Sequence, residues 1–178
     1  MRILLRKISD SKHRLEIVRA DGSRDGVELA SRSFLVHDFL HYAVETRAGL
    51  TASFWGALAS GKSFSDVHES MVDPAARADL QRSEAAVTEA VVGALTGVIQ
   101  ERADAAVAIA GLARLFEAQE RALPAWLTAE FVHGVCDHMR RLRGQWRAVP
   151  FGGEMAIEFG SAVVAASPTE PTDRSRRK

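Results

Sequence analysis

The chain has 178 residues, of which 47 % are hydrophobic and 26 % charged, a composition typical of one globular domain and not of a disordered or fibrous chain. Lysine and arginine (23) balance aspartate and glutamate (23), so bulk charge gives no case for binding nucleic acid or an anionic membrane. A single cysteine, Cys136, excludes an intramolecular disulfide and every multi-cysteine zinc motif. With no apolar run long enough to span a membrane, we expect a cytoplasmic protein with one globular domain over 1–161 and a disordered tail over 162–178.

The N-terminal segment 1–30 predicts short strands separated by turns. Its extended runs are RILLRKIS, HRLEIVRA and GVEL, and the Asp-Gly pair at 21–22 indicates a hairpin turn, because glycine adopts a positive φ without steric cost. In the second run Leu15 and Ile17 share one face while charged residues occupy the other, the pattern of a strand with one buried face. We expect an antiparallel meander.

After this segment the apolar period becomes helical. Ser33 is the expected N-cap of a helix of about four turns, and Gly49 is its expected C-cap glycine. A short second helix is expected around Phe54, ending at Gly61. The following run, KSFSDVHESM at 62–71, shows no clear period and is expected to be a loop.

Two alanine-rich helices are expected next. Asp73 and a proline after it predict the start of the first helix, whose apolar stripe continues to about Arg102. The second helix is expected over 103–122. Gly93 and Gly97, with the many alanines, allow two backbones to approach closely, so we expect a tight helical hairpin and, through it, a homo-oligomer.

The last elements are a helix from Pro124 to about Trp146 and a closing strand over 154–159, where apolar and other residues alternate. A strand that returns after the helices most naturally joins the meander. The sequence thus predicts an α+β fold, in which an N-terminal antiparallel β-meander, joined by a C-terminal strand, packs on a bundle of four to five helices.

The densest set of reactive side chains is HDFLHYAVE at 37–45, on the first expected helix. At about 100° per residue, His37, His41 and Glu45 form one ridge. Two histidines one turn apart can bind one ion at about 2.0 to 2.1 Å, so His37 and His41 are candidate ligands for a divalent metal such as zinc. Glu45 lies roughly 12 Å along the axis from His37, so only neighbouring pairs on this ridge can share an ion.

The spacing His-Asp-x-x-His is similar to the His-Glu-x-x-His helix of zinc metalloproteases, in which the acid after the first histidine is the general base. Asp38 stands in the place of that acid and is a candidate catalytic residue, and Glu45, further along the ridge, is the alternative general base. Asp38 is one methylene shorter than that glutamate, however, and no distal ligand stands at a diagnostic spacing. A His-Asp pair also begins the signature of HD-type phosphohydrolases, but the histidine expected upstream could only be His13, in a predicted strand.

The same ridge has two interpretations without metal. Polar side chains at the border between core and solvent commonly form a structural hydrogen-bond network. They could also form an acid-base or ligand-binding site, for which Tyr42, Trp55 and His138 are the candidate ligand-binding residues. His138 falls on the apolar stripe of the last helix, from which it could complete a site begun by His41.

Other chemistry-bearing groups indicate structure more than function. Cys136 lacks a histidine and asparagine partner set and is expected to be a buried structural thiol. The arginine-rich run at 140–147 could pair with phosphates, but arginines in the last turns of a helix also favour its dipole. Nucleic-acid binding is therefore not expected.

Segments 33–45 and 49–61 resemble a family of uncharacterised bacterial proteins with the pattern Leu-Pro-His-Asp-x-x-His-Tyr-x-Val-Glu, then Gly-Leu-x-x-Gly-Phe-Trp-Gly-x-x-Ala-x-Gly. Val36 stands where the pattern has proline, and Ser53 where it has glycine. The resemblance implies a bacterial origin and singles out the polar ridge and the Phe-Trp-Gly segment: His37, Asp38, His41, Tyr42, Glu45, Phe54, Trp55 and Gly56.

Two functional hypotheses follow from the sequence. The favoured one is a non-enzymatic binding or interaction module, with the His/Tyr/Glu ridge as a ligand site or structural network. The alternative is a metal-dependent hydrolase with His37 and His41 as ligands and Asp38 or Glu45 as general base.

Overall fold

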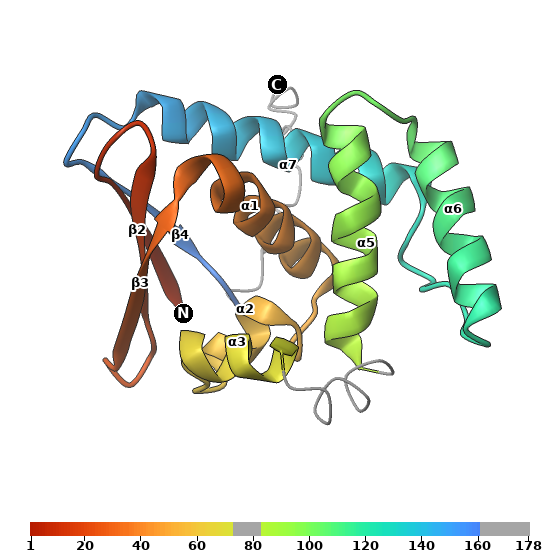
Figure 1. Ribbon diagram of the computed structural model, residues 1–178, viewed down its shortest axis with the longest axis horizontal. Coiled ribbons are helices and arrows are strands. Elements are labelled where there is room, and N and C mark those ends of the chain that lie inside the picture. The colour runs from red at the N-terminus through yellow and green to blue at the C-terminus, as the bar shows by residue number, and fades with distance from the viewer. Residues whose placement is uncertain (73–82, 161–178) are drawn as a thin grey trace, which may run out of the picture.

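A computed structural model describes residues 1–72 and 83–160, and within these ranges the chain forms a four-stranded antiparallel sheet packed against helices (Figure 1). The sheet order is β3-β2-β1-β4. Its strands are β1 Arg2–Lys7, β2 Lys12–Val18, β3 Arg24–Ala30 and β4 Glu154–Glu158. The predicted α+β class is confirmed, and so is the meander joined by a C-terminal strand, which pairs with β1 as an edge.

The sheet has one buried face because apolar residues alternate along its strands. Ile3 and Leu5 on β1 lie opposite Ile17 and Leu15 on β2, and all four are buried. The predicted turn is formed by Gly22, which has a φ of +84°. Ion pairs between arginine and glutamate side chains lie along the strands at more exposed positions. The dry face packs against helix α1, which places that helix at the centre of the molecule (Figure 1).

Within the described residues, three helices pack around this central one. α1 contacts α2, α5 and α7 in addition to the sheet. Four of its apolar side chains are fully buried or nearly so, and three polar ones, Asp38, His41 and Glu45, are buried among them. The bounds of the helices are α1 Ser31–Ala48, α2 Phe54–Ala59, α3 Phe64–Val72, α5 Glu84–Ile99, α6 Ala105–Ala118 and α7 Ala129–Ala148.

Two predicted helix starts were wrong. α1 begins at Ser31 instead of following an N-cap at Ser33, because β3 runs directly into the helix and Ala30 is its N-cap without a side-chain bond. α7 begins at Ala129, five residues after Pro124, because the hydroxyl oxygen of Thr128 accepts the backbone N–H of Phe131 at 3.1 Å. The predicted C-cap was right: Gly49 has a φ of +67° and its N–H donates to Glu45 O.

The segment 62–71 was wrongly predicted as a loop, since most of it belongs to α3. Its start is a reciprocal cap that the apolar period does not show. The N–H of Asp66 donates to Ser63 Oγ at 3.0 Å, and the N–H of Ser63 donates to Asp66 Oδ2 at 2.8 Å. The apolar face of this short helix is small, and Val67 is a buried residue on it.

The predicted helical hairpin is formed by α5 and α6, but the glycines do not make it tight. A Cβ built on Gly93 would meet no atom within 4 Å, and one on Gly97 would meet only Ala103 Cβ, at 3.8 Å. Both therefore lie outside any close backbone crossing. α5 begins at Glu84 after the N-cap Ser83, and the expected start at Asp73 lies outside the described residues, as does the tail 162–178. Within the described ranges, no helix is long and apolar enough to cross a membrane.

Candidate metal site on helices α1 and α5

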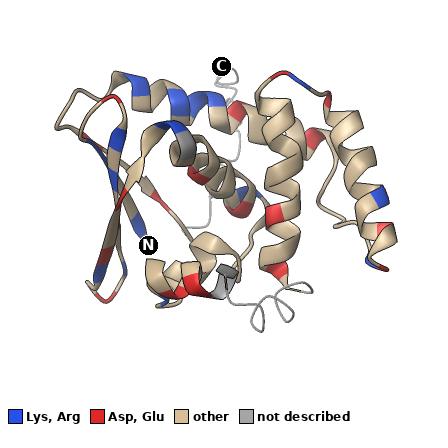
Figure 2. Ribbon diagram, viewed as in Figure 1, with Lys and Arg blue, Asp and Glu red and all other residues tan. Residues whose placement is uncertain are grey.

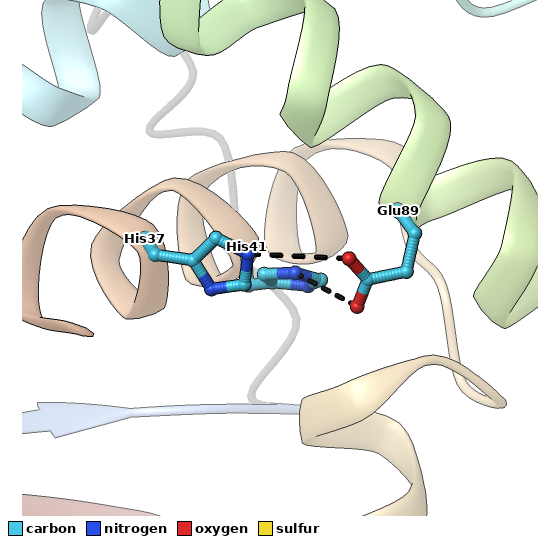
Figure 3. A group of neighbouring side chains, drawn as sticks. All are labelled: His37, His41 and Glu89. Atoms are coloured by element: carbon cyan, nitrogen blue, oxygen red, sulfur yellow. Dashed lines mark ion pairs between the residues drawn. The ribbon is translucent and has the colours of Figure 1, made fainter. Parts of the chain in front are cut away.

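Three ligand-type side chains meet where α5 crosses α1 (Figure 3). His37 and His41 lie one turn apart on α1, and Glu89 reaches across from α5. Glu89 Oε1 lies 3.2 Å from His41 Nε2, and Oε2 lies 3.9 Å from His37 Nε2. One donor atom from each residue lies within 4.8 Å of the other two. Two ligands of one tetrahedral zinc ion are about 3.3 Å apart when each bond is about 2.0 to 2.1 Å, so small side-chain shifts would let all three bind one ion.

Glu45 lies behind His41 and fixes its ring. Glu45 Oε1 is 3.1 Å from His41 Nδ1, while Oε2 accepts the backbone N–H groups of Trp55 at 2.8 Å and Gly56 at 3.3 Å. A carboxylate is an acceptor, so Nδ1 carries the proton that it shares with Glu45. The other ring nitrogen, Nε2, is buried and faces Glu89 Oε1 at 3.2 Å, an ion pair that lacks hydrogen-bond alignment. The contact between Glu45 and Nδ1 is the arrangement in which a carboxylate orients a metal-binding histidine from behind.

The charges of the site are strongly coupled. Burial disfavours a charged His41, but the carboxylates of Glu45 and Glu89 outweigh burial and raise its pKa to about 9. Burial lowers the pKa of His37, and the neighbouring His41 lowers it further. Burial raises the pKa of Glu45, whereas His41 and His37 hold the pKa of Glu89 below its usual value despite burial. Without a metal, His41 is therefore an imidazolium between two carboxylates.

Asp38, the predicted catalytic residue, is buried and lies outside the three-residue cluster. Its Oδ1 is 4.0 Å from His37 Nδ1, and its Oδ2 has no hydrogen-bond partner. Burial raises the pKa of Asp38 to about 7, although the positive charge of His41 opposes this. Both histidines thus turn Nε2 toward Glu89 and Nδ1 toward a carboxylate, His41 in hydrogen-bond contact and His37 at a longer distance.

The Phe-Trp-Gly segment completes the walls of the site. The ring of Phe54 lies 5.7 Å from that of His41, and Trp55 Nε1 donates to the backbone oxygen of Asp38 at 3.3 Å. A Cβ on Gly56 would lie 2.3 Å from the Thr51 carbonyl, so this position requires glycine. The close approach brings the N-terminus of α2 onto the carboxylate of Glu45.

Hydrogen bonds join helix α5 to the residues just before α2, and these bonds position Glu89. Glu84 Oε1 accepts the backbone N–H of Ala52 at 2.6 Å, and the buried hydroxyls of Ser53 and Thr88 hydrogen-bond at 2.7 Å. Glu89 follows Thr88 directly. Sequence reasoning missed it, although a glutamate inside a helix otherwise almost free of charge was an available signal.

Tyr42 and His138, predicted ligand-binding residues, lie together but away from this cluster. The Tyr42 hydroxyl donates to Glu158 O at 2.7 Å, and its ring packs edge-on against His138 at 5.4 Å and Trp55 at 6.5 Å. His138 therefore contacts Tyr42 instead of completing a site with His41. It is half-buried, and the fully buried core position beside it belongs to Met139. Trp55 is buried too, so its side chain offers little surface to a ligand.

The remaining polar groups of α7 face outward. His133 is exposed, and Asp137 pairs with Arg140 on the same helix. Burial raises the pKa of the half-buried Cys136 thiol, which disfavours a reactive thiolate. Basic residues follow one another along the second half of α7 in Figure 2, while the α1–α5 crossing carries the acidic groups described above.

Two histidines and one carboxylate from two helices form a ligand set that zinc and non-haem iron sites share. The side chains of His37 and Glu89 are 47 % and 37 % exposed, whereas that of His41 is 3 % exposed, so the cluster is buried on one side and reachable from solvent on the other. No protein-family model, curated protein or solved structure matches the chain.

Proposed function

We propose that the protein binds one divalent transition-metal ion, with zinc as the first candidate, through His37, His41 and Glu89. The observation that carries the proposal is the state of His41. Its Nδ1 is held by the buried carboxylate of Glu45, and its Nε2 is buried and lies 3.2 Å from Glu89 without hydrogen-bond alignment. Neutral imidazole nitrogen oriented in this way is the commonest protein ligand for such ions.

Charge balance supports an ion in this place. Glu45 and Glu89 bring two negative charges to His41, which carries one proton in the metal-free protein. A dication that replaces this proton matches both carboxylates. His37 contributes no charge to this balance, because burial keeps its pKa below the ordinary value and so keeps it neutral, the form that ligates metals.

The competing function is a binding or interaction module in which these groups are only structural. Glu45 supports this view in part, because it joins α1 to the first turn of α2. A purely structural network does not explain why the buried Asp38 Oδ2 lacks a hydrogen-bond partner, or why His41 Nε2 meets Glu89 without hydrogen-bond alignment. Both observations favour a metal ion beside the two histidines.

Metal content of the purified, untagged protein tests the proposal. The protein is loaded with zinc, dialysed against metal-free buffer and measured by elemental mass spectrometry. We expect about one equivalent in the wild type and a loss in Glu89→Gln, whose half-exposed position makes misfolding a small risk. Glu117→Gln on α6 is the matched control, because Glu117 is exposed and outside the cluster. Zinc absent from the wild type, or retained by Glu89→Gln, would overturn the proposal.

A bacterial, cytoplasmic protein and a homo-oligomer formed through the alanine-rich helices also stay proposals. The exposed apolar side chains of Val107 and Leu115, at 59 % and 42 %, support the second, since both lie on α6. Sedimentation velocity across a tenfold range of concentration tests it. A concentration-dependent dimer that disappears in Leu115→Lys is the expected result, and a monomer throughout would contradict it.

A further inference from the structure

We infer that the bound ion keeps a coordination position open to solvent and takes a small anionic ligand there, such as a carboxylate, azide or hydroxide. The inference rests on the proposed metal site and concerns what the site does with its ion. It separates a reactive centre from a closed, structural one.

The first argument is the number of ligands. Zinc in a structural site has four protein ligands, whereas a catalytic site has three and an exchangeable fourth position. Among the described residues, the cluster contains His37, His41 and Glu89 and no fourth histidine, cysteine, aspartate or glutamate. Glu45 is not available as a fourth ligand, since hydrogen bonds to His41 Nδ1 and two backbone N–H groups engage both of its oxygens.

The second argument is the place of Asp38. It faces the Nδ1 atom of His37, which is the ring nitrogen on the other side from the Nε2 atom that approaches Glu89. Asp38 is thus behind a ligand, as Glu45 is behind His41, and does not reach the point where the three donors converge. The open position is not filled by the acid that follows the first histidine.

The solvent-exposed side of the cluster and the charge left on the ion also favour an anionic ligand. His41, Glu45 and Phe54 line the inner side, while the half-exposed side chains of His37 and Glu89 form the outer side. A ligand therefore arrives from solvent past His37 and Glu89. Glu89 is the one negatively charged group among the three ligands, so a bound dication keeps positive charge toward its open position, while Glu45 behind His41 balances the charge of the site as a whole.

An open position is also what the alternative function requires. A zinc hydrolase holds its water in the fourth position, where the ion lowers the pKa of that water to about 7. The inference therefore connects metal binding to hydrolysis without naming a substrate. An ion with no open coordination position would have only a structural role.

Cobalt(II) absorption spectroscopy with azide as the probe tests the inference. Cobalt(II) takes the place of zinc and gives visible bands that report its coordination. We expect one equivalent of cobalt to produce these bands and azide to change them saturably, while perchlorate at the same ionic strength leaves them unchanged. Glu117→Gln should behave as the wild type, and Glu89→Gln should show neither the bands nor the azide response.

The outcomes separate the two proposals. If cobalt gives no bands and does not bind, the metal site itself fails and this inference fails with it. If one equivalent of cobalt binds but azide leaves the bands unchanged, the metal site stands and the open position is refuted. An azide response that survives in Glu89→Gln would place the ion elsewhere on the surface and would overturn both.

Discussion

Helices α1 and α7 each carry a histidine and an acid one turn apart, and only one of these pairs is part of a site. His41 and Glu45 on α1 are buried under α2 and α5, and a second histidine and Glu89 join them. His133 and Asp137 on α7 have the same spacing, but they are exposed, and Asp137 pairs with an arginine. Burial and a second helix therefore make a ligand set, whereas local spacing only permits one.

The largest loss of stability is expected when Glu45 is replaced. Replacing Glu45 by alanine removes a fully buried carboxylate that holds His41 and two backbone N–H groups, so we expect a loss of about 3 to 5 kcal/mol in the free energy of unfolding. Asp137→Ala should change it by less than about 0.5 kcal/mol, because its ion pair is exposed. Urea unfolding measures both changes, and equal effects would show that burial does not distinguish the two carboxylates.

Gly56 at the site and Gly144 in α7 should respond in opposite ways to an added methyl group. Gly56→Ala places a Cβ 2.3 Å from the backbone carbonyl of Thr51, and we expect it to cost up to about 3 kcal/mol of stability. Gly144 lies in α7 with no atom within 4 Å of an added Cβ, so Gly144→Ala should stabilise by roughly 0.5 to 1 kcal/mol. Thermal unfolding followed by circular dichroism gives the two signs. A stable Gly56→Ala would show that α2 does not need to approach this loop so closely.

Zinc should stabilise the protein through α1 and not through α7. An ion present at 100 times its dissociation constant raises the free energy of unfolding by about 2.7 kcal/mol if it binds only the folded state. We expect this gain in the wild type and in His133→Ala, and its loss in His37→Ala, since His37 is a cluster ligand. Urea unfolding with zinc and with a chelator measures it. If His133→Ala lost this stabilisation by zinc, or if His37→Ala kept it, the ion would bind at α7 instead.

The pH dependence of the metal-free protein gives a smaller effect. The pKa of His41 is raised in the folded state to about 9, from 6.5, so its stabilising contribution is complete below pH 6.5 and is lost as pH rises through about 9. We expect the free energy of unfolding to fall across this window by on the order of 2 kcal/mol, and His41→Gln to flatten the fall. A slope unchanged in His41→Gln would mean that another group titrates there.

Zinc affinity should change in the opposite direction over the same window, because the ion displaces the His41 proton. Titration calorimetry at pH 6.5 and pH 8.5 compares the two conditions. Tighter binding at the higher pH, with proton release, is the expected result. Binding that is independent of pH would mean that His41 is not a ligand.

Much of the fold was predictable because strand alternation and turn glycines are local signals. Leu15 and Ile17 are buried together as their spacing required, and Gly49 ends α1 as predicted. Errors arose where a few hydrogen bonds outweigh periodicity. The cap formed by Ser63 and Asp66 starts α3 inside an expected loop, and Thr128 delays α7 past Pro124.

The order of residues along the chain is enough to place His37, His41 and Glu45 on one ridge of a helix, since their angular spacing follows from helical geometry alone. Which of them share a site depends on how the helices pack. Glu89 enters because the core of the whole molecule brings α5 across α1, and Glu45 is turned behind His41 because α2 starts on its carboxylate. Contacts between segments distant in the chain depend on the packing of every helix, and no local spacing contains that information.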